Sequence, residues 1–335
     1  MAKNITIKDI AREAGVSIAL VSFVMNNRIE ANGKQKYRVS ETTKERILEV
    51  AQRLNYRPSS AARMLRQGRT RVIGVILSDM ANIFYGTIAK ELENRAYLHG
   101  YTVLFGSTEE DPERFSMLVQ SFLEKDVEGF IVVPPAGGGS ILGKLRDSGR
   151  PFVVIDRYNP AYKVPTVLTD NRTAMEMAIK ALKGQGATKI EMVSYAMRIS
   201  SMTDREDSFT NIMGPEANIY HLPFDDVKGN AEKVADEIIR KGTNGVITAS
   251  NVPGVALLQA LFRKGVKIQK DIKFVGFDYS NVYGLFDPHI PYILQPLPRI
   301  ASESAEYLFR LIELQAHGED IRNINDTIVL QATLL

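Results

Sequence analysis

Cysteine is absent from the 335-residue chain. Its absence excludes disulfide bonds, thiolate metal sites and a cysteine nucleophile. Long hydrophobic runs are also missing, because no stretch approaches the ~18 consecutive apolar residues that a membrane span needs. The first residues are interrupted by charged side chains and contain no hydrophobic core of a signal peptide. We therefore expect a cytoplasmic protein that has no membrane partner.

Sequence signatures of catalysis are missing as well. There is no Gly-x-Ser-x-Gly turn for a nucleophilic serine and no G-x-x-x-x-G-K-[ST] loop for a phosphate. The glycine-rich segment 134–140 lacks the lysine and the spacing of such a loop, so we interpret it as a flexible strand-end loop. The four histidines have no metal-ligand spacing; they are His99, His221, His289 and His317. We predict no enzyme, no catalytic residue, no metal site and no cofactor.

The length of the chain exceeds the size at which one hydrophobic core stops growing, which predicts more than one domain. The net charge of +3 hides an asymmetry. Residues 1–70 contain 14 Lys and Arg against 6 Asp and Glu, whereas the remaining residues contain 28 against 33. A basic head on a mildly acidic body is typical of a nucleic-acid-binding module joined to a larger domain. A chance excess on solvated helix faces gives the same count, so charge alone leaves both interpretations open.

Short helices are predicted in the basic head. Residues 7–14 place apolar side chains at the i, i+3, i+4, i+7 spacing of one helix face. Gly15 follows as a turn residue that adopts positive φ without strain. Ser17 is a suitable N-cap for a second helix that ends near Met25. The two helices therefore meet at a sharp turn.

A third helix is predicted over about 43–54. Its first turn could be capped by Ser40 or by the Thr42-x-x-Glu45 pair, and the sequence leaves both open. A proline then breaks the chain and suits the first turn of another short helix, over 59–66.

From residue 72 onward the sequence alternates strands and helices. Several of the strands are runs of Val, Ile and Phe without polar alternation, as expected for parallel strands that are buried on both faces. The intervening segments, such as 85–98 and 253–262, have helical spacing. This alternation implies doubly wound parallel sheets, and about ten such units imply two similar lobes. Ligands of such sheets bind beyond the carboxyl ends of the strands. The predicted strands are 72–78, 102–105, 129–133, 152–155, 167–169, 189–194, 245–248 and 273–276.

The first two predicted helices form a helix-turn-helix pattern over 6–27, in which the second helix can enter a major groove. This segment resembles the head of the lac repressor/galactose repressor family, whose members begin T-I-x-D-V-A-x-x-A-G-V-S-x-x-T-V-S-R-V-L-N. The match continues at 39–40 and 54–58, then at Ala61, Ala62 and Leu65, and through 71–76.

The resemblance implies an all-α helix-turn-helix head and an α/β, periplasmic-binding-protein-like body of two doubly wound parallel-sheet lobes joined by crossover strands. The implied domains are a DNA-binding domain over 1–57, a hinge helix and linker over 58–71, and an effector-binding and dimerisation domain over 72–335. Within the body we expect the first lobe at about 72–169 and 297–325, and the second at about 170–296 and 326–335.

By resemblance, the DNA contacts come from the head and from the hinge helix. In relatives the hinge helix forms when two subunits meet on the minor groove, and a leucine at the place of Leu65 wedges into the central base step and kinks the duplex. Residues 59–66 are too few to hold a helix alone in water, so its formation can be coupled to DNA binding. The implied DNA-binding residues are Thr6, Ser17, Ile18, Ala19, Leu20, Ser22, Phe23, Asn26, Tyr56, Ser59, Ala62, Leu65 and Arg66.

Two departures from the family pattern concern DNA. Leu20 and Phe23 stand where the family frequently has Thr and Arg. The predicted solvent side of that helix, formed by Ile18, Ala19 and Phe23, therefore lacks the bidentate donors that read guanine or adenine. This side could contact thymine methyl groups, but such contacts supply little direct readout of the base sequence. The loop 27–39 is longer than the family norm and basic, and it is either a source of phosphate contacts or a solvated loop.

The body continues the resemblance at the strand ends that line the effector cleft in relatives. Segments 79–85, 126–131, 154–157 and 275–278 resemble the family's D-x-x-N-P-F-F/Y, V-D-G-I-I, I-D-R and V-G-F-D-D patterns. Carboxylates and amides paired with an arginine suit vicinal hydroxyl groups. A sugar is therefore the expected effector, and a purine the less expected one. The implied ligand-binding residues are Ser78, Asn82, Phe84, Asp156, Arg205, Asn251, Asp278 and Gln295.

Further departures leave the ligand's identity open. Ile83 replaces a proline, Val252 an aspartate and Ser208 a glycine of the family patterns, which would also permit a pocket that binds nothing. We predict a nucleoid-associated, ligand-responsive repressor that binds a pseudo-palindromic double-stranded DNA operator as a homodimer. A sugar-binding protein of a transporter would share the body but not the basic head. An α/β enzyme acting on sugars would reveal itself by turnover.

Overall fold

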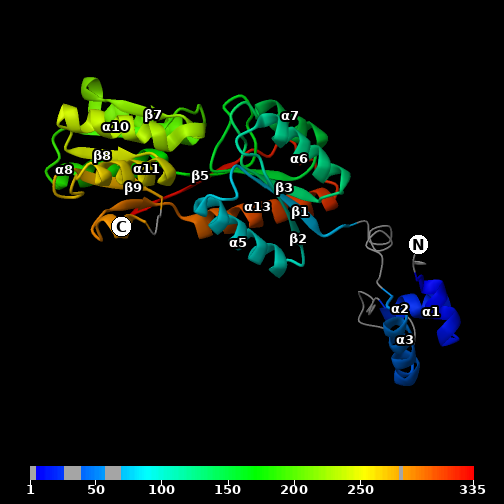
Figure 1. The fold of residues 1–335 in the computed structure, drawn as a ribbon. Coiled ribbons are helices and arrows are strands. Elements are labelled where there is room, and N and C mark those ends of the chain that lie inside the picture. Colours follow the sequence, from blue (N-terminus) through cyan, green and yellow to red (C-terminus); the bar gives the residue numbers. More distant parts are fainter. Residues whose placement is uncertain (1–4, 26–38, 57–68, 279–281) are drawn as a thin grey trace. The chain divides into compact units, whose positions relative to one another are not determined.

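The computed structural model describes residues 5–25, 39–56, 69–278 and 282–335, and it divides into a head of residues 1–70 and a body of residues 71–335 (Figure 1). The predicted hinge helix at 59–66 and almost all of the basic loop at 27–39 lie outside the described residues.

Three helices form the described part of the head: α1 (Ile7–Ala14), α2 (Ile18–Met25) and α3 (Glu41–Arg53). They share one apolar cluster. Gly15 connects the first two with a φ of +64°, as the predicted turn requires. The cluster consists of Ile10, Ala11, Ala14, Val21, Ile47, Val50 and Ala51.

Side-chain caps fix where these helices begin. The Asp9 carboxylate accepts hydrogen bonds from the backbone N–H and the hydroxyl of Thr6, at 3.0 and 2.7 Å. The Ser17 Oγ accepts from the backbone N–H of Leu20 at 3.2 Å. At α3 the Ser40 Oγ accepts from the backbone N–H of Thr43, so Ser40 is the cap of this helix.

The first lobe of the body is built on a six-stranded, wholly parallel sheet in the order β11-β5-β4-β3-β1-β2. Alternate residues of each strand face opposite sides of the sheet, and both sides are covered by helices. α5 (Ile83–Leu98) and α13 (Leu297–Ala316) pack on one side, and α6 (Pro112–Glu124) and α7 (Gly139–Ser148) on the other (Figure 1). The strands are β1 (Val72–Leu77), β2 (Thr102–Ser107), β3 (Gly129–Val132), β4 (Phe152–Ile155), β5 (Thr166–Thr169) and β11 (Thr327–Leu330).

The second lobe repeats this plan with the order β12-β10-β9-β8-β6-β7, in which only the pairing of β12 with β10 is antiparallel. The strands are β6 (Ile190–Tyr195), β7 (Ile219–Leu222), β8 (Gly245–Thr248), β9 (Lys273–Phe277), β10 (Tyr292–Leu294) and β12 (Thr333–Leu334). The helices of this lobe are α8 (Asn171–Gly184), α9 (Ser200–Met213), α10 (Val227–Lys241), α11 (Asn251–Arg263) and the short α12 (Tyr283–Phe286).

The last segment of the chain corrects one expectation. Residues 326–335 were expected in the second lobe, but β11 pairs in parallel with β5 of the first sheet, from Thr327 opposite Thr166 to Leu330 opposite Thr169. Only β12 returns to the second sheet. The reason is that the open edge of β5 offers unpaired backbone groups that a further parallel strand satisfies.

The chain crosses between the lobes after β5, β10 and β11, and the crossings are bonded to one another. The Thr169 hydroxyl donates to the Gln295 side chain at 2.5 Å. The backbone N–H of Asp170 donates to the carbonyl of Leu330 at 2.8 Å, and the Gln331 amide donates to the Asp170 carboxylate at 2.8 Å. The three crossing segments therefore form one connected hinge.

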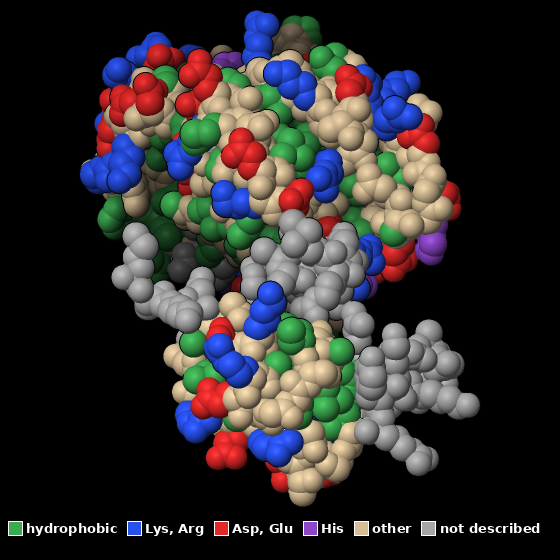
Figure 2. Space-filling view, turned by 90° about the vertical axis from the view of Figure 1, so that its right-hand side faces the viewer, with side chains coloured by type: hydrophobic (Ala, Val, Ile, Leu, Met, Phe, Trp, Pro, Cys, Tyr) green, Lys and Arg blue, Asp and Glu red, His purple; other side chains and the backbone are tan. Residues whose placement is uncertain are grey.

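Among the described residues, no helix is both long enough and apolar enough to cross a bilayer. Figure 2 shows basic and acidic side chains interspersed over the visible face of the body.

Candidate functional site

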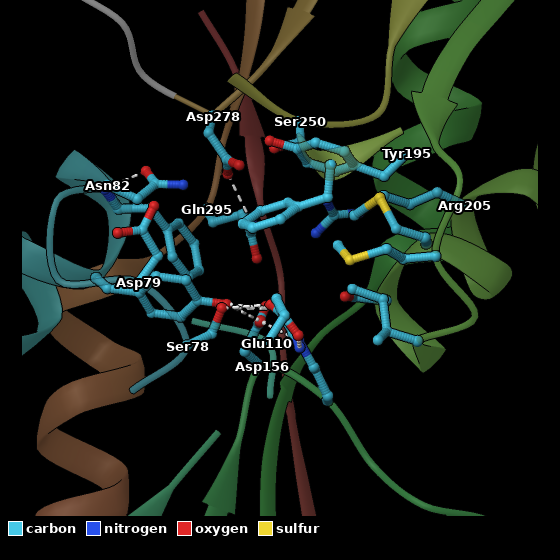
Figure 3. Close-up of a pocket in the computed structure, with 18 residues that line it drawn as sticks. Ser78, Asp79, Asn82, Glu110, Asp156, Tyr195, Arg205, Ser250, Asp278 and Gln295 are labelled. Carbon is cyan, nitrogen blue, oxygen red and sulfur yellow. Dashed lines mark hydrogen bonds and ion pairs between the residues drawn. The ribbon is translucent and has the colours of Figure 1, made fainter. Parts of the chain in front are cut away.

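A pocket lies between the two lobes of the body, where the carboxyl ends of the strands of both sheets meet (Figure 3). Its atom-free space, including the opening to solvent, is about 470 Å³. The lining residues are Ser78, Asp79, Asn82, Phe84, Tyr85, Glu110, Asp156, Arg157, Tyr195, Met197, Ile199, Ser201, Met202, Arg205, Phe224, Ser250, Asp278 and Gln295.

Two buried aspartates occupy equivalent places in the two lobes. Asp156 directly follows β4 and Asp278 directly follows β9, and these strands have the same position in their sheets. Both residues have a φ of +67°. Left-handed backbone outside glycine is uncommon, and such conformations gather at functional sites. The two lobes thus present one carboxylate each to the pocket in the same way.

Arg157 organises the first-lobe side of the pocket. It is buried and makes a two-pronged ion pair with Glu110, with N–O distances of 2.8 and 2.6 Å. It also donates to the hydroxyl of Tyr85 at 3.0 Å and contacts the Asp156 carboxylate at 3.3 Å. Tyr85 in turn donates to Asp156 at 2.9 Å, and the Ser78 hydroxyl donates to Glu110. The first-lobe groups therefore satisfy one another.

The local backbone places Glu110 in this network. Glu109 and Glu110 follow β2 and adopt φ values of +51° and +61°, which turns the second side chain toward Arg157. Burial alone raises the pKa of Glu110, but its hydrogen bonds and charge attraction to Arg157 outweigh burial and hold the pKa below its ordinary value. Glu110 is therefore an ionised, structural partner of the arginine.

Arg205, from α9, lies on the second-lobe side of the pocket and differs from Arg157 in its ion pairing. It is 2% exposed and donates to the Asn171 side chain at 2.8 Å and to the Ala249 carbonyl at 2.6 Å. Its guanidinium carbon lies 3.8 Å from the centre of the Phe277 ring. No carboxylate of the described residues forms an ion pair with it, and burial lowers its pKa. A buried cation without an ion-pair partner favours the binding of a ligand that accepts hydrogen bonds.

Asp278 connects the pocket to the hinge. Burial raises the pKa of Asp278 to about 6, although Arg205 and a hydrogen bond from Gln295 oppose the rise. The Gln295 amide donates to the Asp278 carboxylate at 2.6 Å, and its own oxygen accepts from Thr169. A ligand that bonds to Asp278 therefore touches a group tied to two of the three lobe crossings.

Two other lining hydroxyl groups, those of Tyr195 and Ser201, have no hydrogen-bonding partner among the described residues. Tyr195 is 6% exposed, and no described residue hydrogen-bonds to its hydroxyl; burial, and then the nearby Asp79, Glu110 and Asp278 carboxylates, raise its pKa. Ser201 is likewise buried, with no hydrogen-bonding partner among the described residues. Apolar side chains complete the wall: Phe84, Met197, Ile199, Met202 and Phe224.

Hydrogen bonds also join the lobes at the pocket rims. At one rim the Asn251 amide donates to the Asn82 side chain at 3.0 Å. At the other, the Tyr158 hydroxyl donates to the Asp204 carboxylate at 3.0 Å, and the Tyr158 backbone N–H donates to the Ser200 hydroxyl at 2.7 Å. The lobes are thus in contact on both sides of the pocket.

Seven of the eight predicted ligand residues line the pocket; Asn251 does not, and sits at the rim beside Asn82. Sequence reasoning missed Glu110, Arg157 and Tyr195. Arg157 lies in the quoted I-D-R segment and could have been found there, whereas Glu110 has no signal in the sequence. The seven that line the pocket are Ser78, Asn82, Phe84, Asp156, Arg205, Asp278 and Gln295.

In the head, α2 carries the predicted base-reading residues, and the structure corrects one of them. Ile18 is 49% exposed and Ala19 is exposed, but Phe23 is only 8% exposed and is not on a solvent face as expected. A large aromatic ring is stabilised by burial, here outside the shared apolar cluster. Thr6 and Ser17 are exposed, and Leu20, Ser22 and Tyr56 are half-buried. Five predicted DNA contacts lie outside the described residues: Asn26, Ser59, Ala62, Leu65 and Arg66.

The polar lining of the pocket consists of hydrogen-bonding and charged side chains. Among the described residues, no group of three or more His, Cys, Asp or Glu side chains could hold a metal ion. The pocket offers a guanidinium, two aspartates and two unused hydroxyl groups to a ligand rich in hydroxyl groups.

Two family models match this chain. Residues 73–284 match the periplasmic binding protein domain, and residues 6–59 match the bacterial regulatory proteins of the lacI family.

Curated relatives match over nearly their whole length. The chain is 27% identical to catabolite control protein A of Staphylococcus epidermidis, over 96% of this chain and 95% of that protein. It is 28% identical to the ribose operon repressor of Bacillus subtilis, over 94% of each. It is also 28% identical to the transcriptional repressor PurR of Vibrio cholerae, over 98% of each.

Solved structures share the fold. The lac repressor bound to ONPG superimposes with a TM-score of 0.82 at 20% identity, over 99% of this chain and 98% of that one. A putative ribose operon repressor from Burkholderia thailandensis superimposes with a TM-score of 0.69 at 26% identity, over 80% of this chain and 99% of that one.

Proposed function

The chain belongs to the lacI family of bacterial regulatory proteins, and from this premise we propose that it is a transcriptional repressor. It binds a pseudo-palindromic operator as a homodimer through residues 1–57, and a small molecule in the body pocket controls that binding. The protein acts on DNA and therefore works in the cytoplasm, at the nucleoid. It has no catalytic role.

The observation that carries this proposal is the unequal state of the two sides of the pocket. The first-lobe groups around Arg157 are already satisfied by one another. Arg205, Tyr195 and Ser201 on the second lobe have hydrogen-bonding capacity that no described residue uses. A ligand would complete that side, in a chain whose head is a helix-turn-helix.

A sugar is the effector that suits these groups best. The guanidinium of Arg205 offers the N–H donors that Asn171 and Ala249 leave unused, and the ionised carboxylate of Asp278 accepts from hydroxyl groups, so together they match vicinal hydroxyls. The relatives named for a ribose operon support this class. A purine, after the relative PurR, is the second choice.

Coupling to DNA would run through the hinge. A ligand on Asp278 bears on Gln295 and Thr169, and so on the angle between the lobes. An effector shifts operator affinity only by as much as it binds the two arrangements of the lobes unequally. We propose that residues 58–71 carry this signal, with 59–66 forming paired hinge helices and Leu65 wedging into the central base step.

Selection of random duplex DNA by the purified full-length protein tests the proposal, when it is repeated with a panel of sugars and nucleobases. We expect enrichment of a near-palindrome whose binding one compound abolishes or strengthens. Binding that is only nonspecific and salt-sensitive would contradict sequence-specific repression.

The variant Arg205→Gln separates sensing from DNA binding. Hydrogen bonds to charged groups contribute ~1.5–3 kcal/mol each, so we expect effector affinity to fall about tenfold to hundredfold. Affinity for the operator without effector should stay the same. Arg240→Gln, an exposed arginine of α10 in the same lobe, is the matched control. Equal effector response in both variants would remove the pocket from the mechanism.

A further inference from the structure

We propose that the head reads thymine methyl groups. In this proposal α2 presents an apolar tip, Ile18 and Ala19, to the major groove, and its base preference comes from contact with C5-methyl groups instead of hydrogen bonds to purines. The inference rests on the proposed operator-binding function and specifies what that function recognises.

The composition of α2 leaves few other side chains that could recognise a base. Its sequence, IALVSFVM, contains no Arg, Lys, Asn, Gln, Asp or Glu. These are the side chains that make bidentate hydrogen bonds to guanine and adenine or accept from cytosine. Ser22 is the one hydroxyl in the helix. The Ser17 hydroxyl just before it already accepts the backbone N–H of Leu20 as the helix cap.

The packing of the head decides which side of α2 faces outward. Val21 is buried in the apolar cluster of the head, and Leu20, Val24 and Met25 pack against that cluster. At 100° per residue these four positions lie together on one side of the helix. Ala19 and Ser22 lie on the opposite side, and Ile18 lies at the border between the two sides, next to Met25.

Exposure narrows the reading surface further. Ile18 is 49% exposed and Ala19 is exposed, whereas Ser22 is half-buried. Phe23, on the same side, is only 8% exposed and does not offer its ring to solvent. A single exposed aliphatic residue on a protein surface is ordinary. On α2, the helix proposed to enter the major groove, this exposed aliphatic side chain is the group available to contact a base.

Thymine supplies the matching partner. Its C5-methyl group is an apolar feature of the major groove, and contact with small apolar side chains distinguishes thymine from the other bases. Phosphate contacts can supply affinity without sequence information.

Deoxyuridine isolates the proposed contact, because it differs from thymidine only in lacking the methyl group. The probe is the duplex enriched by full-length protein, with each thymine of both half-sites replaced in turn by deoxyuridine. Affinity is measured by fluorescence anisotropy at fixed salt. Losing one buried methyl costs ~0.8 kcal/mol, so we expect about fourfold weaker binding for each methyl that α2 contacts.

A pair of matched variants assigns the contact to the helix. Ile18→Ala should abolish the deoxyuridine penalty at the position that Ile18 covers. Leu48→Ala, at a leucine of α3 that is 45% exposed, should leave every penalty unchanged. Both positions are exposed, so both variants should keep the wild-type melting temperature.

Each outcome has a definite meaning. A penalty that disappears in Ile18→Ala and persists in Leu48→Ala supports the proposal. A specific operator that tolerates deoxyuridine at every position overturns it while leaving the repressor function standing. A penalty that survives in Ile18→Ala also overturns the assignment to the tip of α2. Failure to enrich any operator would defeat the proposed function itself.

Discussion

Replacing Asp278 by asparagine should make the protein more stable at neutral pH. Burial raises the pKa of this carboxyl from 3.8 to about 6. Each tenfold change in proton affinity is worth ~1.36 kcal/mol, so the ionised form costs up to about 3 kcal/mol of folding free energy at pH 7. The asparagine carbonyl can still accept the Gln295 hydrogen bond, while the buried negative charge is removed.

The effect has a fixed pH dependence. Between pH 3.8 and about 6 the folded protein holds a proton on Asp278 that the unfolded chain has released. Wild type therefore loses stability as pH rises through this range and gains it as pH falls. The advantage of Asp278→Asn should be greatest above pH 6 and shrink to about 1 kcal/mol near pH 4.5.

Thermal unfolding of the full-length protein, followed by circular dichroism from pH 4.5 to 7.5, measures this. For a body of this size ~1 kcal/mol corresponds to about 2–4 °C, which gives a rise of up to about 6–12 °C at pH 7.5. Asp207→Asn, at an exposed aspartate of α9, is the control and should change little. A variant no more stable than wild type, or an advantage that is the same at every pH, would refute the reasoning.

Two further substitutions test the pocket floor and the head. Glu110→Gln leaves the buried Arg157 with a weaker counter-charge. It should destabilise the protein by the lower end of the ~3–5 kcal/mol seen for broken buried pairs, because Asp156 remains beside the arginine. The exposed Glu109→Gln is the control, and equal melting temperatures of the two variants would count against the ion pair. Ser40→Ala should speed hydrogen exchange in the first turn of α3 by the equivalent of ~0.5–2 kcal/mol, whereas Thr42→Ala should not; the reverse order would mean that the cap is misassigned.

The sequence predicted the architecture of the body well because its signals are local. Eight strands were predicted, several of them from runs of Val, Ile and Phe, and each appears within two residues of its predicted bounds. The strands that escaped are β7, β10, β11 and β12; β10 and β12 are only three and two residues long, whereas β11 has an Ile-Val-Leu run and was still not predicted. Their existence is decided by pairing with a distant strand, as β11 with β5, and local pattern carries no trace of that.

The pocket was partly predictable for a related reason. Residues directly after strands, such as Asp156 and Asp278, must lie at the carboxyl edge of a parallel sheet. Glu110 comes three residues beyond the end of β2 and reaches the pocket through two consecutive left-handed residues. Neither Glu109 nor Glu110 is a glycine, so the sequence gives no indication of this turn.

Phe23 illustrates the limit of helical periodicity. Its angular position on α2 is opposite Val21, and periodicity therefore places it in solvent. The structure buries it outside the cluster that holds the three helices together. An argument that considers one helix face at a time does not detect such burial.

The interleaved path of the chain through the two lobes constrains how the protein is made on the ribosome. The first sheet begins at Val72, yet α13, one of the two helices that cover one side, and the edge strand β11 come from residues 297–316 and 327–330. The second sheet is likewise completed only by β12 at 333–334. Neither lobe can close while the chain is being synthesised, so an early stop codon upstream of β11 yields two unfinished sheets with open edges instead of one finished lobe and one missing one.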